Sequence, residues 1–96
     1  MSSFRRLLPS ANNLIVFEAA GRHENFTRAA EELGMSQAAV SYAIRALEEQ
    51  LGVVLFDRVH RAARLTEVGE RFHSDVSAGL SRIGRRSEEH TSELQS

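Results

Sequence analysis

The sequence contains no cysteine, and proline occurs once in 96 residues. Without cysteine, the chain has no disulfide, no thiol nucleophile and no thiolate metal ligand. No apolar run approaches the roughly 20 residues that a membrane-spanning helix needs, and the first residues lack the pattern of a signal peptide. We therefore expect a cytoplasmic protein with no membrane partner.

Patterns of catalytic residues are missing as well. His23, His60 and His73 do not have the spacing of metal ligands, and neither a phosphate-binding loop nor a nucleophile elbow is present. The isolated serine and histidine residues form no visible catalytic arrangement. We therefore expect neither an enzyme nor a bound cofactor or metal ion.

What is present indicates one small, mostly helical domain, 42% hydrophobic in composition and with a formal charge of −1. A core of this size is marginal on its own, so a partner surface is expected. The only proline, Pro9, and Ser10 mark a helix start, and the first helix should cover residues 11–20, before a loop at residues 21–24. Ile15 adds apolar surface that could contact another subunit or be covered within the domain.

Residues 26–51 have the pattern of two helices joined by a tight turn. Asn25 and Ser36 are good N-caps, and Gly34 follows the first helix, where a positive φ is needed. Ala30, Gly34 and Val40 have the small-residue spacing typical of DNA-binding helix-turn-helix motifs. The alternative is an ordinary corner of two helices that serves stability alone.

Residues 36–51 should form the recognition helix. If Val40, Ile44 and Leu47 face the core, a step of 100° per residue turns one set of side chains outward near the start of the helix. This set is Gln37, Ala38, Ser41, Tyr42 and Arg45. Arginine can bind guanine, glutamine can bind adenine, and a small alanine can contact a thymine methyl group in the major groove. The alternative for each residue is a solvated surface side chain.

After this helix, the apolar residues no longer recur at helical spacing. An apolar run at residues 53–56 and a second short segment ending at Leu65 predict a β-hairpin wing over residues 55–65. Arg58, Arg61 and Arg64 would place three positive charges there for contact with phosphates or the minor groove. Thr66 should then cap a fourth helix, whose apolar residues recur at spacings of four and three. They are Val68, Phe72, Val76, Leu80 and Ile83, and we expect them to mediate self-association.

The sequence NFTRAAEELGMSQAAVSYAIRALEEQLGVVLFDRVHRAARLTEVG resembles the N-terminal domain of LysR-type transcriptional regulators, and LPSANNLIVFEAAGRH resembles the subgroup that includes the glycine-cleavage activator. The resemblance covers residues 7 to about 85. It implies a winged helix-turn-helix domain (residues 1–65) and a dimerising linker helix (residues 66–85). The DNA-contacting positions of the family match Thr27, Ser36, Gln37, Ser41, Tyr42, Arg45 and, in the wing, Arg58. Tyr42 departs from the arginine, histidine or glutamine more often found there.

The resemblance also implies a homodimer or higher oligomer on double-stranded DNA, at an interrupted palindrome. A larger effector-binding domain, which would take a small molecule in a full-length parent, is absent from this chain. Residues 86–96, RSEEHTSELQS, equal the in-frame translation of a common sequencing-library adapter, so we interpret them as a non-native tail and the linker helix as truncated. Because this segment holds one arginine and three glutamates, leaving it out changes the formal charge from −1 to +1.

Two functions are compatible with these patterns. The first is sequence-specific DNA binding by a bacterial transcription regulator, associated with the nucleoid through its DNA. The second is a helical interaction module that dimerises through its fourth helix without binding DNA. Arg45 and the wing arginines distinguish the two, because only the first function needs them at the surface.

Overall fold

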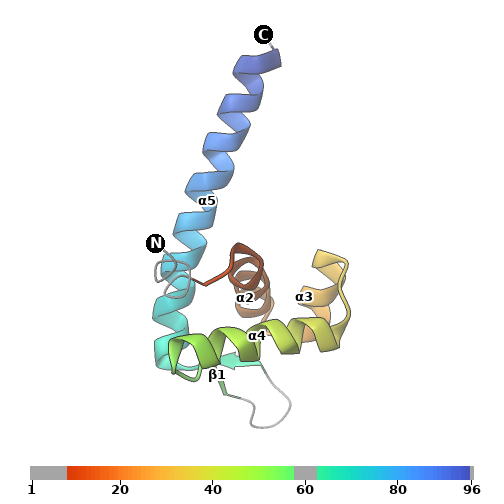
Figure 1. Ribbon diagram of the computed structural model, residues 1–96, viewed down its shortest axis with the longest axis vertical. Helices are drawn as coiled ribbons and strands as arrows, with labels where there is room; N and C mark the ends of the chain where they lie inside the picture. Colours follow the sequence, from red (N-terminus) through yellow and green to blue (C-terminus); the bar gives the residue numbers. More distant parts are fainter. Residues whose placement is uncertain (1–8, 58–62, 96) are drawn as a thin grey trace.

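The computed structural model describes residues 9–57 and 63–95, with side chains described as far as Gly84. The elements of the described residues, in chain order, are α2 (Ala11–His23), α3 (Phe26–Leu33), α4 (Gln37–Leu51), β1 (Phe56–Asp57), β2 (Arg64–Leu65) and α5 (Glu67–Gln95). Figure 1 shows α2, α3 and α4 gathered into one body, from which α5 rises along the longest axis. This is the mostly helical winged helix-turn-helix fold, with a following long helix, that the sequence predicts.

Side-chain caps start the helices where the sequence predicts them. Side-chain oxygens of Ser10, Asn25 and Ser36 each accept a hydrogen bond from the backbone N–H three residues later, at 3.0–3.1 Å. Thr66 does the same at the start of α5, at 3.0 Å. Each cap satisfies a backbone donor that has no partner inside its helix.

The first helix is longer than predicted. We expected it to end at Ala20, with residues 21–24 in a loop, but α2 continues to His23. Gly21 remains helical at a tight contact with α5, where an added Cβ would lie 2.5 Å from Cδ2 of His73. This tertiary packing outweighs the low helix propensity of glycine. The helix ends instead at Glu24, which adopts a left-handed φ of 50°.

The first strand of the wing is shorter than the predicted run at residues 53–56. β1 and β2 pair antiparallel, with Phe56 opposite Leu65. Residues 53–55 lie outside the strand, where the N–H of Val53 donates to the backbone carbonyl of Glu48 at 3.3 Å and the carbonyl of Leu55 accepts the N–H of Thr66 at 2.9 Å. The carboxylate of Glu48 accepts hydrogen bonds from the backbone N–H groups of Leu55, at 2.8 Å, and Phe56, at 3.3 Å.

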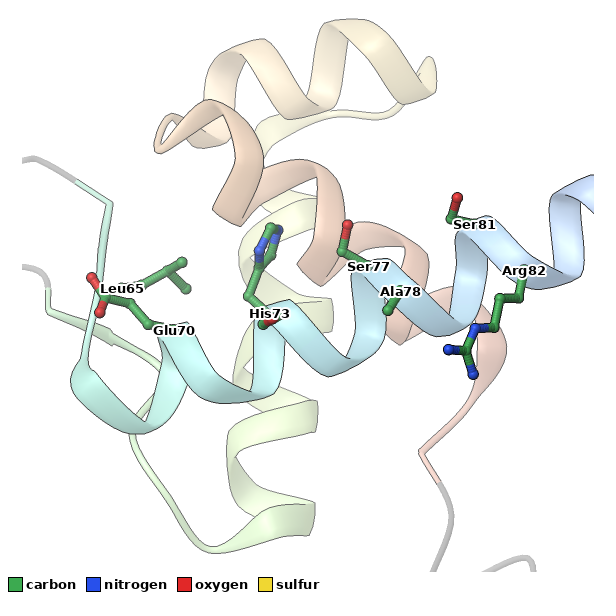
Figure 2. A pocket seen from close by; sticks show the side chains of 8 residues that line it. Leu65, Glu70, His73, Ser77, Ala78, Ser81 and Arg82 are labelled. Atoms are coloured by element: carbon green, nitrogen blue, oxygen red, sulfur yellow. The ribbon is translucent and has the colours of Figure 1, made fainter.

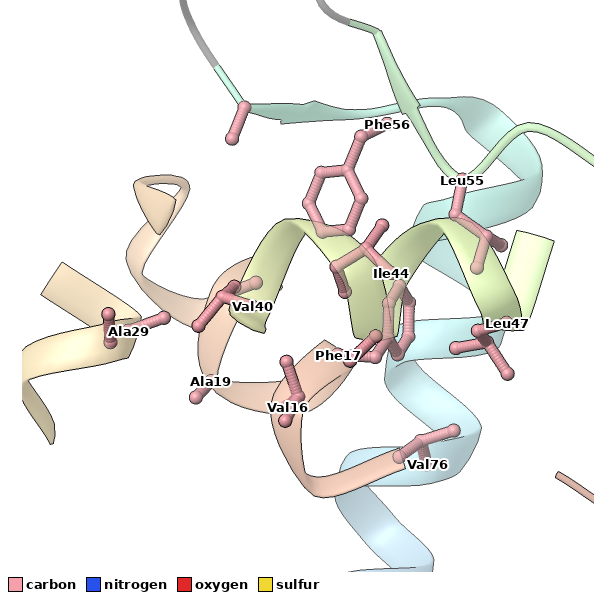
Figure 3. Packing of buried hydrophobic residues seen from close by; sticks show 14 residues of the cluster. Val16, Phe17, Ala19, Ala29, Val40, Ile44, Leu47, Leu55, Phe56 and Val76 are labelled. Carbon is pink, nitrogen blue, oxygen red and sulfur yellow. The ribbon is translucent and has the colours of Figure 1, made fainter. Parts of the chain in front are cut away.

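The core lies between α2, α4 and the segment that leads into β1 (Figure 3). Its largest fully buried side chains are Phe17, Phe56, Ile44, Leu47, Leu55, Val16 and Val40. The ring of Phe17 contacts Phe56 edge-on, with ring centroids 5.7 Å apart, and also contacts Phe72 of α5 at 5.2 Å. One aromatic side chain therefore joins α2 to the wing and to the long helix.

The first half of α5 is fixed to the rest of the domain. The hydroxyl of Thr66 donates to the carbonyl of Val54 at 2.7 Å, and Nε2 of His73 lies 2.9 Å from the carbonyl oxygen of Glu18. At Gly69, an added Cβ would collide with the backbone carbonyl of Leu55. Within the described ranges, no helix is long and apolar enough to cross a membrane.

Two of the glycines in α5, Gly69 and Gly79, should respond in opposite directions to substitution by alanine. Gly69→Ala forces the backbone apart and should lower the free energy of unfolding by roughly 1–3 kcal/mol. Gly79→Ala meets no atom within 4 Å and should raise it by roughly 0.5–1 kcal/mol through helix propensity. Urea unfolding followed by circular dichroism measures both; equal effects would contradict the close approach at Gly69.

Candidate nucleic-acid interface

The turn between α3 and α4 is held by backbone hydrogen bonds. Gly34 adopts a φ of 66°, which costs glycine little, and the N–H of Met35 donates to the carbonyl of Ala30 at 2.9 Å. Ala30 and Val40 are both buried on the inner side of this turn. The predicted roles of these small and branched residues in the helix-turn-helix are therefore confirmed.

The outer side of α4 is a continuous surface. Gln37, Ala38, Tyr42 and Arg45 are exposed, and Ser41 at the edge of this face is half-buried. The exposed fraction reaches 77% at Tyr42, whereas Val40 and Ile44 on the inner side are completely buried. The structure thus brings all five predicted recognition residues of α4 together on one face.

Two more predicted residues lie at the ends of the short helices. Thr27 is exposed in the first turn of α3. Ser36 is exposed as well, and its Oγ accepts the N–H of Ala39 at 3.1 Å, which leaves the hydroxyl proton free to donate to a phosphate. Arg28, also exposed beside Thr27, is a cation that the sequence prediction omitted. Its place next to a predicted contact residue in the first turn of α3 is the signal that could have identified it.

The structure describes part of the predicted wing cluster. Arg64 is exposed on β2, directly opposite Asp57 on β1. Arg58 and Arg61 lie outside the described residues. The prediction that these two arginines contact DNA therefore remains a prediction.

Glu48 has a role that the sequence did not reveal. Glu48 and Glu49 are adjacent acidic residues near the end of α4. Glu49 is exposed, but Glu48 is half-buried and its Oε2 bonds the backbone of the segment that enters β1. The carboxylate thus connects α4 to the wing. No sequence signal distinguishes the two adjacent glutamates.

An ionic cluster connects α2 with α3 behind this surface. Arg22 contacts Glu32 at 2.7 Å and Glu18 at 3.0 Å, and His23 approaches Glu32 at 2.8 Å. Hydrogen bonds from Arg22, and then from His23, lower the pKa of Glu32 to about 2. The two glutamates in turn raise the pKa of Arg22. The cluster bridges α2 and α3 at the surface, above the buried apolar contacts between them.

The apolar residues predicted for dimerisation divide into two groups. Val76 is 8% exposed and belongs to the core of the domain, and Phe72 and Leu80 pack against that core. Within one chain, these three already have apolar partners, because α5 lies against α2. Ile15, Val68 and Ile83 remain exposed, at 44%, 48% and 64%. An apolar groove of about 280 Å³ runs past Phe72, Val76, Leu80 and Ile83.

A second, polar groove of about 620 Å³ lies along another side of α5. Figure 2 shows His73 directed from α5 toward the neighbouring helices, while Ser81 and Arg82 lie further along the groove. Nε2 of His73 is engaged by the carbonyl of Glu18, so it is not available to activate a serine. The described residues also contain no group of three or more histidine or acidic side chains placed to hold a metal ion.

A sequence profile described as "Bacterial regulatory helix-turn-helix protein, lysR family" matches residues 11–70. The chain belongs to the lysR family. Over 76 residues it is 50% identical to the glycine cleavage system transcriptional activator of Escherichia coli (strain K12), which covers 79% of this chain and 25% of that protein. The chain thus spans about a quarter of the length of the curated relatives it matches. These lysR-family relatives are transcriptional regulators and not enzymes.

Two solved structures of DNA-binding domains have the same fold. The CbnR DNA-binding domain in complex with DNA is 34% identical, with a TM-score of 0.75, and the match covers 86% of this chain and 95% of that one. The BenM DNA-binding domain in complex with benA site 1 DNA is 30% identical, with a TM-score of 0.80, covering 91% and 97%. Both matches cover more than four-fifths of this chain.

The hydrogen bonds between the Glu48 carboxylate and the wing predict that substitutions at Glu48 and at Glu49 lower the free energy of unfolding of this lysR-family domain by different amounts. Glu48→Ala should lower the free energy of unfolding by roughly 1–3 kcal/mol, because two backbone N–H groups lose their acceptor. Glu48→Gln keeps an acceptor oxygen and should lose less. Chemical denaturation of these variants beside Glu49→Ala checks the assignment, which fails if the two alanine variants are equally stable.

The ionic cluster predicts a pH dependence. Because the pKa of Glu32 is lowered in the folded domain, its contribution to stability is present above the ordinary value of 4.5 and is lost as the pH falls toward about 2. Glu32→Gln should therefore be less stable than the original chain at neutral pH and should converge with it near pH 2. Unfolding curves from pH 7 to pH 2 measure this, with Glu31→Gln as a control on the same helix; a gap that persists at pH 2 would refute the mechanism.

Proposed function

We propose that this chain is the DNA-binding domain of a bacterial transcription regulator, and that it binds double-stranded DNA sequence-specifically in the cytoplasm. In this proposal α4 enters the major groove, and the wing at residues 55–65 lies along the backbone and the minor groove. The observation that carries the proposal is the exposed face of α4 in a helix-turn-helix whose solved relatives are named as DNA complexes.

The chemistry of the exposed face supports this proposal. From Gln37 to Leu47, the only charged residue of α4 is Arg45, a cation suited to guanine. Gln37 and Ser41 flank it with polar groups that can bond bases or phosphates, while Thr27 and Ser36 offer hydroxyls at helix starts. Acidic residues begin only at Glu48, which is turned toward the wing backbone. The first three turns of α4 can therefore approach a polyanion without repulsion from carboxylates of their own.

We further propose that the domain works as a homodimer through α5 and Ile15. Three of the apolar residues predicted for dimerisation, Val68, Ile83 and Ile15, are exposed on the free chain. Ile83 also lines the apolar groove, together with Leu14 and Leu80. A two-fold dimer places two copies of α4 on successive turns of one face of the DNA, so the target would be an interrupted palindrome. A small-molecule effector would belong to a full-length parent, whose additional length this chain does not span.

DNA binding predicts distinct effects for two arginines. Arg45→Ala should weaken binding to the preferred sequence by roughly 1–3 kcal/mol and alter base preference, because a base contact is lost. Arg64→Ala should weaken binding to all sequences alike and reduce the salt dependence by about one unit of slope. Arg58→Ala should behave as Arg64→Ala does.

Fluorescence anisotropy at several salt concentrations measures these effects. Arg82→Ala, an exposed cation on the projecting part of α5, is the matched control. If Arg45→Ala and Arg64→Ala bind with unchanged affinity and salt slope, the domain does not use this face for DNA, and the interaction-module function takes its place.

Self-association predicts an asymmetry around α5. Ile83→Glu puts a charge into the apolar surface and should weaken dimerisation by roughly tenfold or more. Ser81→Glu, two residues earlier and on the polar side of the helix, should leave it unchanged. Sedimentation equilibrium compares the two variants. Equal dimerisation would remove α5 from the proposed interface.

A further inference from the structure

Tyr42 is the most exposed large apolar side chain of the described residues, at 77%. It lies near the middle of the outer face of α4, opposite the buried Val40 and Ile44. Covering an aromatic ring that is this exposed to water is favourable. The other exposed large apolar residues belong to α2, the segment before β1, and α5. On α4 itself, Tyr42 is the only large apolar group that faces outward.

Ala38 lies one turn before Tyr42 on the same face and is exposed too. Residues four apart in a helix are neighbours on its surface, and long side chains lean toward the N-terminus, over the preceding turn. The ring of Tyr42 therefore extends over the turn that carries the methyl group of Ala38. Together the two side chains make a small apolar surface, with Gln37 and Ser41 along one edge and Arg45 one turn further on.

We infer that the ring of Tyr42, beside the methyl group of Ala38, reads the 5-methyl group of thymine. The inference rests on the proposed DNA binding through α4. Of the four bases, thymine alone presents a methyl group in the major groove, and apolar side chains recognise it by contact. The hydroxyl of tyrosine both donates and accepts, so it discriminates poorly among base edges, and the ring supplies the selectivity.

Deoxyuridine isolates this contact, because it differs from thymidine by the methyl group alone. A preferred duplex is first selected with the 96-residue chain from a random-sequence library. Each thymidine in it is then replaced in turn by deoxyuridine, and affinities are measured at one fixed salt concentration. Loss of one methyl contact should weaken binding by roughly threefold to fivefold at one position in each half-site.

Variants of Tyr42 assign the effect to the ring. Tyr42→Phe should keep the preference for thymidine over deoxyuridine, and Tyr42→Ala should abolish it while leaving the fold intact, because the side chain is exposed. Arg45→Ala, on the same face, should weaken binding but keep the preference.

Two results would overturn the inference: equal affinity for thymidine and deoxyuridine at every position, or a preference that survives in Tyr42→Ala. A general loss of affinity in Tyr42→Phe, with no change in the methyl preference, would support the ring as the methyl reader and add the hydroxyl as a phosphate contact. If no sequence is selected and binding to DNA is undetectable, the proposed function itself has failed, which is a separate result.

Discussion

The contact of Phe17 with Phe56 and Phe72 is the constraint on which the domain depends. Phe17 comes from α2, Phe56 from the start of the wing, and Phe72 from α5, so three segments distant in sequence converge on one buried ring. Phe26 of α3 meets the same Phe56 ring at a centroid distance of 5.2 Å. Edge-to-face pairs favour particular ring angles as well as close distances, so they orient the segments that they join. This packing sets how α2, α3, the start of the wing and α5 lie relative to one another.

The features that sequence alone predicted are those set by neighbouring residues. Caps at Asn25 and Ser36, the left-handed glycine at position 34 and the apolar period of α4 all act within one or two turns of chain. The outer face of α4 follows from the same period, and for that reason the sequence placed its five predicted recognition residues on one face.

What the sequence did not reveal depends on contacts between distant segments. Gly21 remains helical beside the His73 ring, 52 positions along the chain, and a helix that seemed to end at Ala20 continues. Residues 53–55 lie outside the strand, and the carboxylate of Glu48 accepts the N–H of Leu55 there. Nothing in a window of neighbouring residues separates Glu48 from Glu49, since only their directions relative to the wing differ.

The apolar residues of α5 that recur along one side of the helix fall into a buried group and an exposed group. Mutations in the two groups would respond differently to protein concentration. Phe72 and Val76 support the fold of their own subunit, whereas Val68 and Ile83 are exposed in it. A lesion at Val76 lowers the folded fraction, which does not depend on concentration, so additional synthesis raises folded and unfolded chain in the same proportion. A lesion at Ile83 that only weakens assembly is corrected by mass action when the protein is more abundant. Overexpression would therefore raise the assembled fraction of one class of α5 mutant and leave the folded fraction of the other unchanged, although both classes lie on a single helical stripe.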